Sequence, residues 1–184
     1  MTLLHPCCLV IIDVQEKLAA VMHNREQMIG NCVILSQTAK HLDIPILWCE
    51  QAPKSLGPTV CELREVLEGN RAIEKTSFNC CGEPVFVTEL EKISTASVLL
   101  CGIESHVCVF QTAAELLERG LKVHVIADAV SSRTEGNKEI GLARMAAAGA
   151  VISSTEMLLF ELIRDARHPK FKELASLIKG NSGR

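Results

Sequence analysis

The chain has 184 residues, 48% of them hydrophobic and 22% charged, which is ordinary for a folded globular protein and excludes a mainly disordered one. Its 19 Lys and Arg residues against 22 Asp and Glu residues give a formal net charge of −3, and no basic run stands out. A nucleic-acid partner is therefore not expected. No linker, repeat or low-complexity tract divides the chain, so we expect residues 1–184 to form a single domain.

The start of the chain and its cysteines predict a cytoplasmic protein without membrane contact. The apolar run Cys7–Ile12 is ended by Asp13 and is far shorter than the ~20 residues that a membrane helix needs. Residues 1–6 carry no Lys or Arg and do not resemble a secretory signal. The nine cysteines are odd in number, lie in apolar segments and show no C-x-x-C spacing, which indicates reduced, mostly buried thiols.

In chain order, short apolar runs alternate with segments in which apolar residues recur every three or four positions. The runs are apolar on both alternations, which is typical of parallel strands that are buried on both faces. The expected strands are Cys7–Ile12, Ile46–Cys49, Arg71–Lys75, Ser97–Cys101, Val123–Ala127 and Ala150–Ile152. The expected helices include Arg25–Leu42, His106–Arg119, Lys138–Ala148 and a last helix after Pro169 that ends in a frayed tail, GNSGR. The pattern predicts an α/β fold with helices on both faces of the sheet.

Three reactive residue types follow three of the expected strands. Asp13 ends the first strand, Lys75 ends the third, and Cys108 opens the helix after the fourth. Because ligands of parallel α/β sheets bind at the carboxyl ends of the strands, we expect these side chains on one rim, with Ala52–Pro58 as a loop beside them. Neither G-x-G-x-x-G nor G-x-x-x-x-G-K-[ST] occurs, so no nucleotide cofactor is expected.

A cysteine at the start of a helix is a candidate nucleophile. Ser105 is placed to cap the helix, and the helix dipole and Lys75 would then favour a Cys108 thiolate. Asp13 would take the thiol proton and return it to a leaving amine. The alternative remains open that Cys108 is one more buried thiol, Asp13 a strand-end cap and Lys75 a surface charge, since free cysteine is usually core.

Three segments in the same order carry a family resemblance: LVIIDVQEKL at Leu9–Leu18, IEKTSFN at Ile73–Asn79, and the long stretch from CGIESHVCV to AVSSR at Cys101–Arg133. Together they resemble the isochorismatase-like, or cysteine hydrolase, family over nearly the whole chain. EQAPKSLGPTV at Glu50–Val60 and HPKFKEL at His168–Leu174 resemble its isochorismatase domain-containing branch.

The resemblance implies a fold, a triad and a strained loop. The implied fold is a Rossmann-like, three-layer α/β/α sandwich with a six-stranded parallel sheet, and homo-oligomers are common in such a family. The implied triad is Asp13, Lys75 and Cys108. A cis peptide between Ile103 and Glu104 would aim backbone N–H groups, those of Val107 and Cys108, as an oxyanion hole.

This sequence departs from relatives that bind a metal. Family nicotinamidases begin a metal site with D-x-H after the second strand, whereas Glu50 and Gln51 stand there and no histidine lies between His41 and His106. No metal and no cofactor are therefore expected. His106 stands where the family more often has Asp, and either contacts substrate or faces solvent.

Other side chains are candidates for the substrate pocket, each with an ordinary structural alternative. Gln15 would orient the Asp13 carboxylate or lie on the surface, and Trp48 and Phe78 would line the pocket or pack in the core. The complete set of pocket candidates is Gln15, Trp48, Glu50, Gln51, Phe78 and His106.

Together these features predict a metal-independent cysteine amidohydrolase that cleaves a C–N bond of a small amide-like molecule through a thioester. The family's amidases use the cysteine that isochorismatases proper lack, and Cys108 is present here. Three alternatives remain: a binding or scaffold protein that keeps the hydrolase fold, a redox-responsive protein with many thiols, and an enzyme that acts on nucleic acid, which the acidic charge balance disfavours. The sequence does not name the substrate.

Overall fold

The computed structural model describes residues 4, 6–69 and 71–181, and within them six strands form one sheet in the order β3-β2-β1-β4-β5-β6. Every neighbouring pair is parallel, so the predicted six-stranded parallel sheet is confirmed. The strands are β1 Cys7–Ile12, β2 Ile46–Gln51, β3 Ile73–Lys75, β4 Ser97–Ile103, β5 Lys122–Ser131 and β6 Val151–Ser153.

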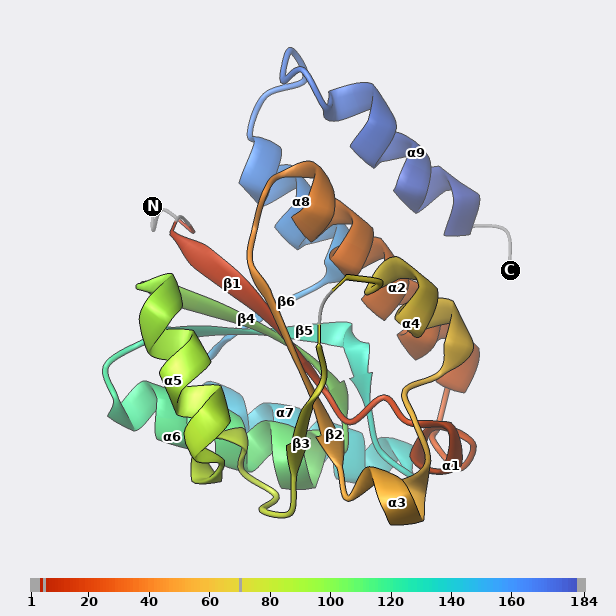
Figure 1. The fold of residues 1–184 in the computed structure, drawn as a ribbon. Coiled ribbons are helices and arrows are strands. Elements are labelled where there is room, and N and C mark those ends of the chain that lie inside the picture. Colours follow the sequence, from red (N-terminus) through yellow and green to blue (C-terminus); the bar gives the residue numbers. More distant parts are fainter. Residues whose placement is uncertain (1–3, 5, 70, 182–184) are drawn as a thin grey trace.

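Helices cover both faces of the sheet and make the fold three-layered (Figure 1). On one face lie α2 Arg25–His41, α4 Cys61–Val66 and α8 Thr155–Ile163, with α9 Phe171–Asn181 packed against α2 and α8 from outside. On the other face lie α5 Pro84–Ile93, α6 Phe110–Glu118 and α7 Glu135–Ala147. Two short helices, α1 Glu16–Ala19 and α3 Pro53–Leu56, follow the carboxyl ends of β1 and β2.

Strand β1 shows why the sheet is buried on both faces. Its six residues are all buried, and alternate side chains enter different apolar clusters. Leu9 and Ile11 pack with α2, α4 and α8, whereas Val10 and Ile12 pack with α5, α6 and α7. An uninterrupted apolar run is therefore what a central parallel strand requires.

The structure differs from the expected elements at the ends of several of them and by helices that were not expected. Strand β5 continues through Asp128 to Ser131, because the Asp128 carboxylate finds a partner in Thr155 at the start of α8. Helices α5 and α8 were not among the expected elements, and the expected loop Ala52–Pro58 contains the single turn α3. The predicted frayed tail begins inside α9 and continues into residues 182–184, which lie outside the described residues.

All nine cysteines are free thiols and seven are buried, as predicted; Cys61 is exposed and Cys81 is half-buried. In the described part of the chain, no helix combines the length and apolarity needed to span a membrane.

Candidate active site

The carboxyl edge of the sheet brings Asp13, Lys75 and Cys108 together. Asp13 follows β1 with a left-handed φ of 54°, which Asp tolerates better than most residues, and its amide donates to the Cys49 carbonyl at 3.1 Å. Lys75 is the last residue of β3, and Cys108 lies in a π-helical turn, Ser105–Val109, between β4 and α6. The Lys75 ammonium and Asp13 Oδ2 are 2.8 Å apart, and both side chains are fully buried.

Two glycines allow the close packing behind this edge. Gly102 in β4 has φ 113°, and a Cβ there would lie 2.1 Å from the carbonyl oxygen of Ile12, next to Asp13. Gly141 of α7 lies against the turn that carries Cys108, where a Cβ would meet Ser105 Oγ at 2.6 Å. Larger residues at either position would push the catalytic turn or β4 away from β1.

The ammonium of Lys75 is fully engaged by the protein. It donates to Asp13 Oδ2 at 2.8 Å and to Gln51 Oε1 at 2.7 Å. The carbonyl oxygens of Ser77 and Phe78 accept from it at 3.2 Å each. Because an ammonium has only three N–H groups, these four acceptors leave none for a substrate.

Asp13, in contrast, keeps one free oxygen. Among the described residues, none donates a well-formed hydrogen bond to its buried Oδ1. The Cys108 thiol is close enough that its interaction with the carboxylate lowers the pKa of Asp13 and raises that of Cys108. The backbone amide of Gln51 also lowers the pKa of Asp13. The carboxylate is thus anchored through Oδ2, while Oδ1 has no hydrogen-bond partner of good geometry among the described residues.

Burial dominates the acid–base properties of the site. Burial raises the pKa of Asp13, although Lys75 opposes the shift. Burial alone would lower the pKa of Lys75, but the negative charge of Asp13 and the neighbouring thiols raise it overall. Burial and then the Asp13 charge raise the pKa of Cys108 to about 12, against the effect of Lys75. The raised pKa contradicts the predicted low-pKa thiolate, because burial and the charge of Asp13 both favour the thiol form of Cys108.

The turn before Cys108 differs from the expected helix start. The expected cis peptide bond between Ile103 and Glu104 is present. Ser105 does not cap a helix, since its hydroxyl donates instead to the Lys138 carbonyl of α7 at 3.2 Å. The amide of Val107 donates to the Glu104 carbonyl at 3.0 Å. Val107 N–H is therefore already used within the turn, which contradicts its expected place in an oxyanion hole.

Glu104 and His106 tie this turn to the segment that follows β5. The Glu104 carboxylate is mostly buried and accepts a hydrogen bond from the Arg133 guanidinium at 3.1 Å. His106 Nδ1 lies 3.0 Å from the Ser132 hydroxyl, and its side chain is half-buried. His106 is thus neither simply solvent-facing nor shown to reach the thiol.

Two of the expected pocket residues instead hold the loop after β2. Gln15 is fully buried, and its amide bonds the backbone of Gln51 and Gly57, not the Asp13 carboxylate. Glu50 Oε1 accepts from both the amide and the hydroxyl of Thr59, each at 2.7 Å. Both expectations for Gln15, that it orients Asp13 or lies on the surface, are wrong, because its buried side chain hydrogen-bonds to three backbone groups.

The two aromatic candidates lie in different places. Trp48 belongs to the apolar cluster under α2 and α4, across the sheet from the cluster that contains Cys108, so its assignment to the pocket is wrong. Phe78 is 55% exposed, and its carbonyl accepts from Lys75. Its backbone therefore lies beside the triad, and most of its ring is exposed.

One neighbour of the triad did not stand out in the sequence. Cys80 is completely buried, and its interactions contribute to the pKa values of both Lys75 and Cys108. Its amide donates to the hydroxyl of Thr112 in α6 at 3.0 Å. Only its position five residues after Lys75 could have indicated it, since nine cysteines share its residue type.

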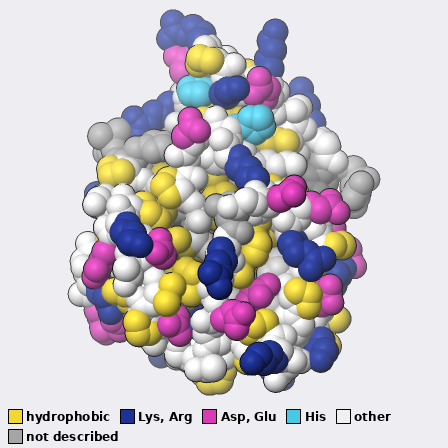
Figure 2. All heavy atoms as spheres, in the orientation of Figure 1, with side chains coloured by type: hydrophobic (Ala, Val, Ile, Leu, Met, Phe, Trp, Pro, Cys, Tyr) yellow, Lys and Arg dark blue, Asp and Glu magenta, His cyan; other side chains and the backbone are white. Residues whose placement is uncertain are grey.

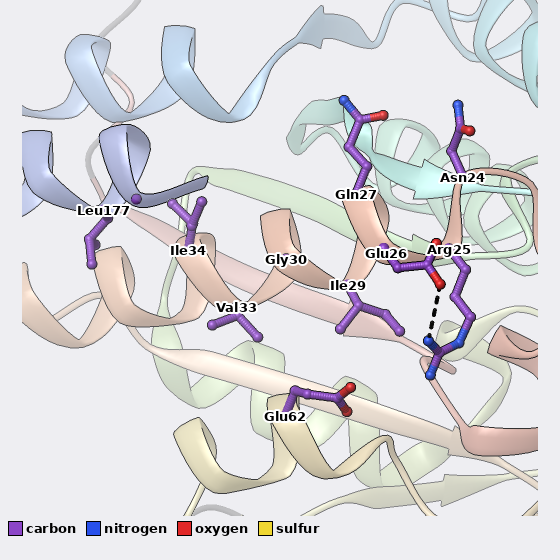
Figure 3. Close-up of a pocket in the computed structure, with 11 residues that line it drawn as sticks. Asn24, Arg25, Glu26, Gln27, Ile29, Gly30, Val33, Ile34, Glu62 and Leu177 are labelled. Atoms are coloured by element: carbon purple, nitrogen blue, oxygen red, sulfur yellow. Dashed lines mark ion pairs between the residues drawn. The ribbon is translucent and has the colours of Figure 1, made fainter. Parts of the chain in front are cut away.

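A groove away from the triad lies on the other face of the sheet. This groove of about 880 Å³ runs between α2, α4 and α9, with Glu62 of α4 facing α2 and an Arg25–Glu26 ion pair at one end (Figure 3). It is separated from Cys108 by the sheet. Within the described residues, no group of three or more His, Cys, Asp or Glu side chains is arranged to hold a metal ion.

Comparisons with known proteins agree on one family. A model of the Isochorismatase domain matches residues 7–157. Isochorismatase domain-containing protein 2 of Rattus norvegicus is 44% identical over 172 residues, which cover 93% of this chain and 80% of the rat protein. The Homo sapiens protein of the same name is 41% identical over 172 residues, covering 93% of this chain and 82% of its own length.

Solved structures share the fold. The MAR1 ribonuclease from Caenorhabditis elegans has a TM-score of 0.89 at 41% identity, covering 94% of this chain and 89% of its own. An octameric Escherichia coli hydrolase of unknown specificity has a TM-score of 0.89 at 24% identity and covers 95% of this chain and 87% of its own, which shows likeness of fold alone. With the matched domain spanning most of its length, this chain belongs to the isochorismatase family, as its motifs indicate.

Proposed function

We propose that this hydrolase-family chain cleaves a C–N bond of a small amide-like substrate, with Cys108 as nucleophile, Asp13 as acid–base and Lys75 as the charge that holds Asp13. The observation that carries the proposal is the buried Asp13–Lys75 pair, in which one carboxylate oxygen is anchored and the other stays free beside a thiol. A nucleophile with an adjacent base that is itself held by a third group is the arrangement that covalent catalysis requires.

In the first half-reaction, the Cys108 sulfur attacks the carbonyl carbon of the amide while Asp13 Oδ1 takes the thiol proton. The tetrahedral intermediate collapses as the C–N bond breaks, and Asp13 returns the same proton to the departing nitrogen. The products are an acyl thioester on Cys108 and a free amine or ammonia.

In the second half-reaction, a water molecule attacks the thioester carbon while Asp13 accepts its proton. The C–S bond then breaks, the thiolate regains that proton, and a carboxylic acid leaves. No metal or cofactor is needed to balance either step. A raised Cys108 pKa suits this sequence of steps, because the proton is removed only as the sulfur attacks.

Lys75 has a specific task in this proposal. Its N–H groups are taken by protein acceptors, so it contributes charge to Asp13 and does not bind the substrate. The ammonium keeps Asp13 ionised in a buried site where burial favours the neutral acid.

The test is a screen of small primary amides with an ammonia-release assay and intact-mass detection of a covalent adduct. We expect turnover in the wild type and its loss in Cys108→Ala, with the fold retained. Cys81→Ala is the matched control, because Cys81 is also a free thiol but its pKa responds to Arg119, Cys80 and Glu115 and not to Asp13 or Lys75. Turnover in Cys108→Ala equal to that of the control would refute the mechanism.

A second candidate is cleavage of RNA, which the similarity to the Caenorhabditis elegans protein called MAR1 ribonuclease favours. Against it, the net charge is −3, and on the face shown in Figure 2 basic and acidic side chains are interspersed. Incubation of labelled single-stranded RNA with wild type and Cys108→Ala decides between them: cleavage that both proteins share would come from a contaminant, and cleavage lost with Cys108 would favour the ribonuclease.

A homo-oligomer in the cytoplasm completes the proposal. The Escherichia coli structure of similar fold is described as octameric, which supports assembly without fixing the number of subunits here. Light scattering of the purified chain measures that number. The scaffold and redox alternatives predict, respectively, partner binding that survives Cys108→Ala and an assembly state that changes on oxidation.

A further inference from the structure

A buried glutamine links the loop after β1 to the end of β2. Gln15 has no exposed surface. Its Nε2 donates to the carbonyl oxygens of Gln51 at 3.0 Å and Gly57 at 2.7 Å, and its Oε1 accepts from the Gln51 amide at 2.7 Å. The side chain thus pairs with both backbone groups of Gln51 as a neighbouring strand would, at the point where β2 ends.

Gln51 connects the backbone held by Gln15 to the side chain of Lys75. With its backbone held by Gln15, its side chain reaches Lys75, where Oε1 accepts from the ammonium at 2.7 Å. The same amide group is oriented by a second bond, from Nε2 to the Thr76 carbonyl at 2.7 Å. The oxygen therefore cannot turn away from Lys75 without breaking the bond to Thr76.

We propose that Gln51, clamped by Gln15, is a positioning residue that holds the Lys75 ammonium on Asp13 Oδ2 and so leaves Oδ1 free for the Cys108 proton. This inference rests on the proposed function, because it assigns a role to Lys75 within that reaction. It also replaces the sequence-based expectation that Gln15 and Gln51 line the substrate pocket.

The neighbouring Glu50 supplies a matched comparison. It stands next to Gln51 on β2 and also ties down the loop after β2, through Thr59, but it is not among the acceptors of the Lys75 ammonium in the described structure. If loop order alone mattered, weakening the Glu50 contact would have the same effect as weakening the Gln51 contact. If positioning of Lys75 matters, only the Gln51 and Gln15 variants affect the chemical step.

The experiment measures kcat and KM over a range of pH for Gln51→Met, Gln51→Glu, Gln15→Met, the Gln15→Met/Gln51→Met double variant and Glu50→Gln. We expect Gln51→Met to lose about 10- to 100-fold in kcat with KM nearly unchanged, the loss typical of a misplaced catalytic group. Gln15→Met should lose a similar amount, and the double variant no more than either single one, because both act through one contact.

Gln51→Glu keeps the acceptor but adds a negative charge near Asp13. We therefore expect the acidic limb of its pH–rate profile to move to higher pH, since a nearby anion raises the pKa of a carboxyl group. This variant also covers the case in which Gln15→Met fails to fold. A loss that appears in KM alone, multiplying losses in the double variant, or an equal effect of Glu50→Gln on kcat would overturn the proposal.

Alkylation of Cys108 by iodoacetamide, followed by peptide mass mapping, separates this inference from the proposed function. It needs no turnover, and the added charge of Gln51→Glu should slow it relative to wild type and Glu50→Gln at the same pH. If Cys108→Ala retains turnover, the proposed function fails whatever this measurement gives. If Cys108→Ala is inactive but Gln51→Glu alkylates as fast as wild type, the positioning role alone fails.

Discussion

The substitution Lys75→Met isolates the energetic cost of the buried ion pair. Methionine keeps most of the length and volume of the lysine side chain, so packing changes little, but Asp13 loses its counter-charge. Neither side chain of the pair has any exposed surface. Removing one partner of such a pair typically destabilises a protein by about 3–5 kcal/mol, because the remaining charge is buried without compensation.

The cost should depend on pH, and its sign follows from Asp13. In the variant, burial raises the folded-state pKa of Asp13 without opposition from Lys75, far above the value of about 3.9 in an unfolded chain. A carboxyl whose folded pKa is raised binds a proton more readily when folded, so stability falls as pH rises between the two values. Because burial raises the pKa of Asp13 in the wild type too, the loss relative to wild type should grow only between the folded-state pKa of Asp13 in the wild type and its higher value in the variant, by about 1.4 kcal/mol per pH unit.

Urea unfolding of wild type and Lys75→Met at about pH 5 and about pH 8 measures this difference. We expect the full loss of about 3–5 kcal/mol at the higher pH and a much smaller one at the lower pH. In the double variant Asp13→Asn/Lys75→Met, which has neither charge of the pair left to bury, the contribution of Asp13 to the pH dependence should disappear. A loss that is the same at both pH values, or below about 1 kcal/mol at the higher one, would refute the reasoning.

Three further predictions concern single residues outside the ion pair. Gly102→Ala should destabilise the protein strongly and reduce turnover, because its Cβ would lie 2.1 Å from the Ile12 carbonyl oxygen; thermal melting and the amide assay report the two effects. Burial lowers the pKa of His124, and its ring nitrogens have no hydrogen-bond partner among the described residues, so the unfolded chain binds the proton better than the folded one. Wild type should therefore lose stability below about pH 6.5, and His124→Leu should remove that loss. Urea unfolding at two pH values tests this prediction. Trp48→Phe should lower the melting temperature but leave KM unchanged, because Trp48 packs across the sheet from Cys108; a raised KM would return it to the pocket.

The strands were predictable because their signal is local. The run Cys7–Ile12 was predicted with the bounds that the structure has, since all six of its residues are buried and apolar. The end of β5 was not, because Asp128 and Ser131 read as loop residues in sequence. Their side chains hydrogen-bond to residues that are distant in the sequence, Thr155 and the carbonyl of His23. A local sequence pattern does not predict such contacts.

In the candidate site, too, the sequence predicts what depends on strand order and not what depends on distant contacts. That Asp13, Lys75 and Cys108 share one edge follows from parallel strands alone, since the carboxyl ends of such strands meet there. Which hydrogen bonds their neighbours make does not follow, because Gln15 meets Gly57 across 42 positions of the chain. A glutamine two residues after Asp13 is compatible with a surface position, a substrate contact or a clamp, and only the packed structure distinguishes these roles.

The protonation state of Cys108 shows how a correct list of neighbours can still give a wrong chemical conclusion. A lysine and a helix start beside a cysteine favour the thiolate. The same lysine, however, is 2.8 Å from Asp13 Oδ2, so the negative charge of Asp13 offsets most of its effect on the thiol. Burial of the thiol and the neighbouring charge of Asp13 then raise the pKa of Cys108 to about 12. In the proposed mechanism, Asp13 Oδ1, which has no hydrogen-bond partner among the described residues, is the base that generates the thiolate only when a substrate is bound.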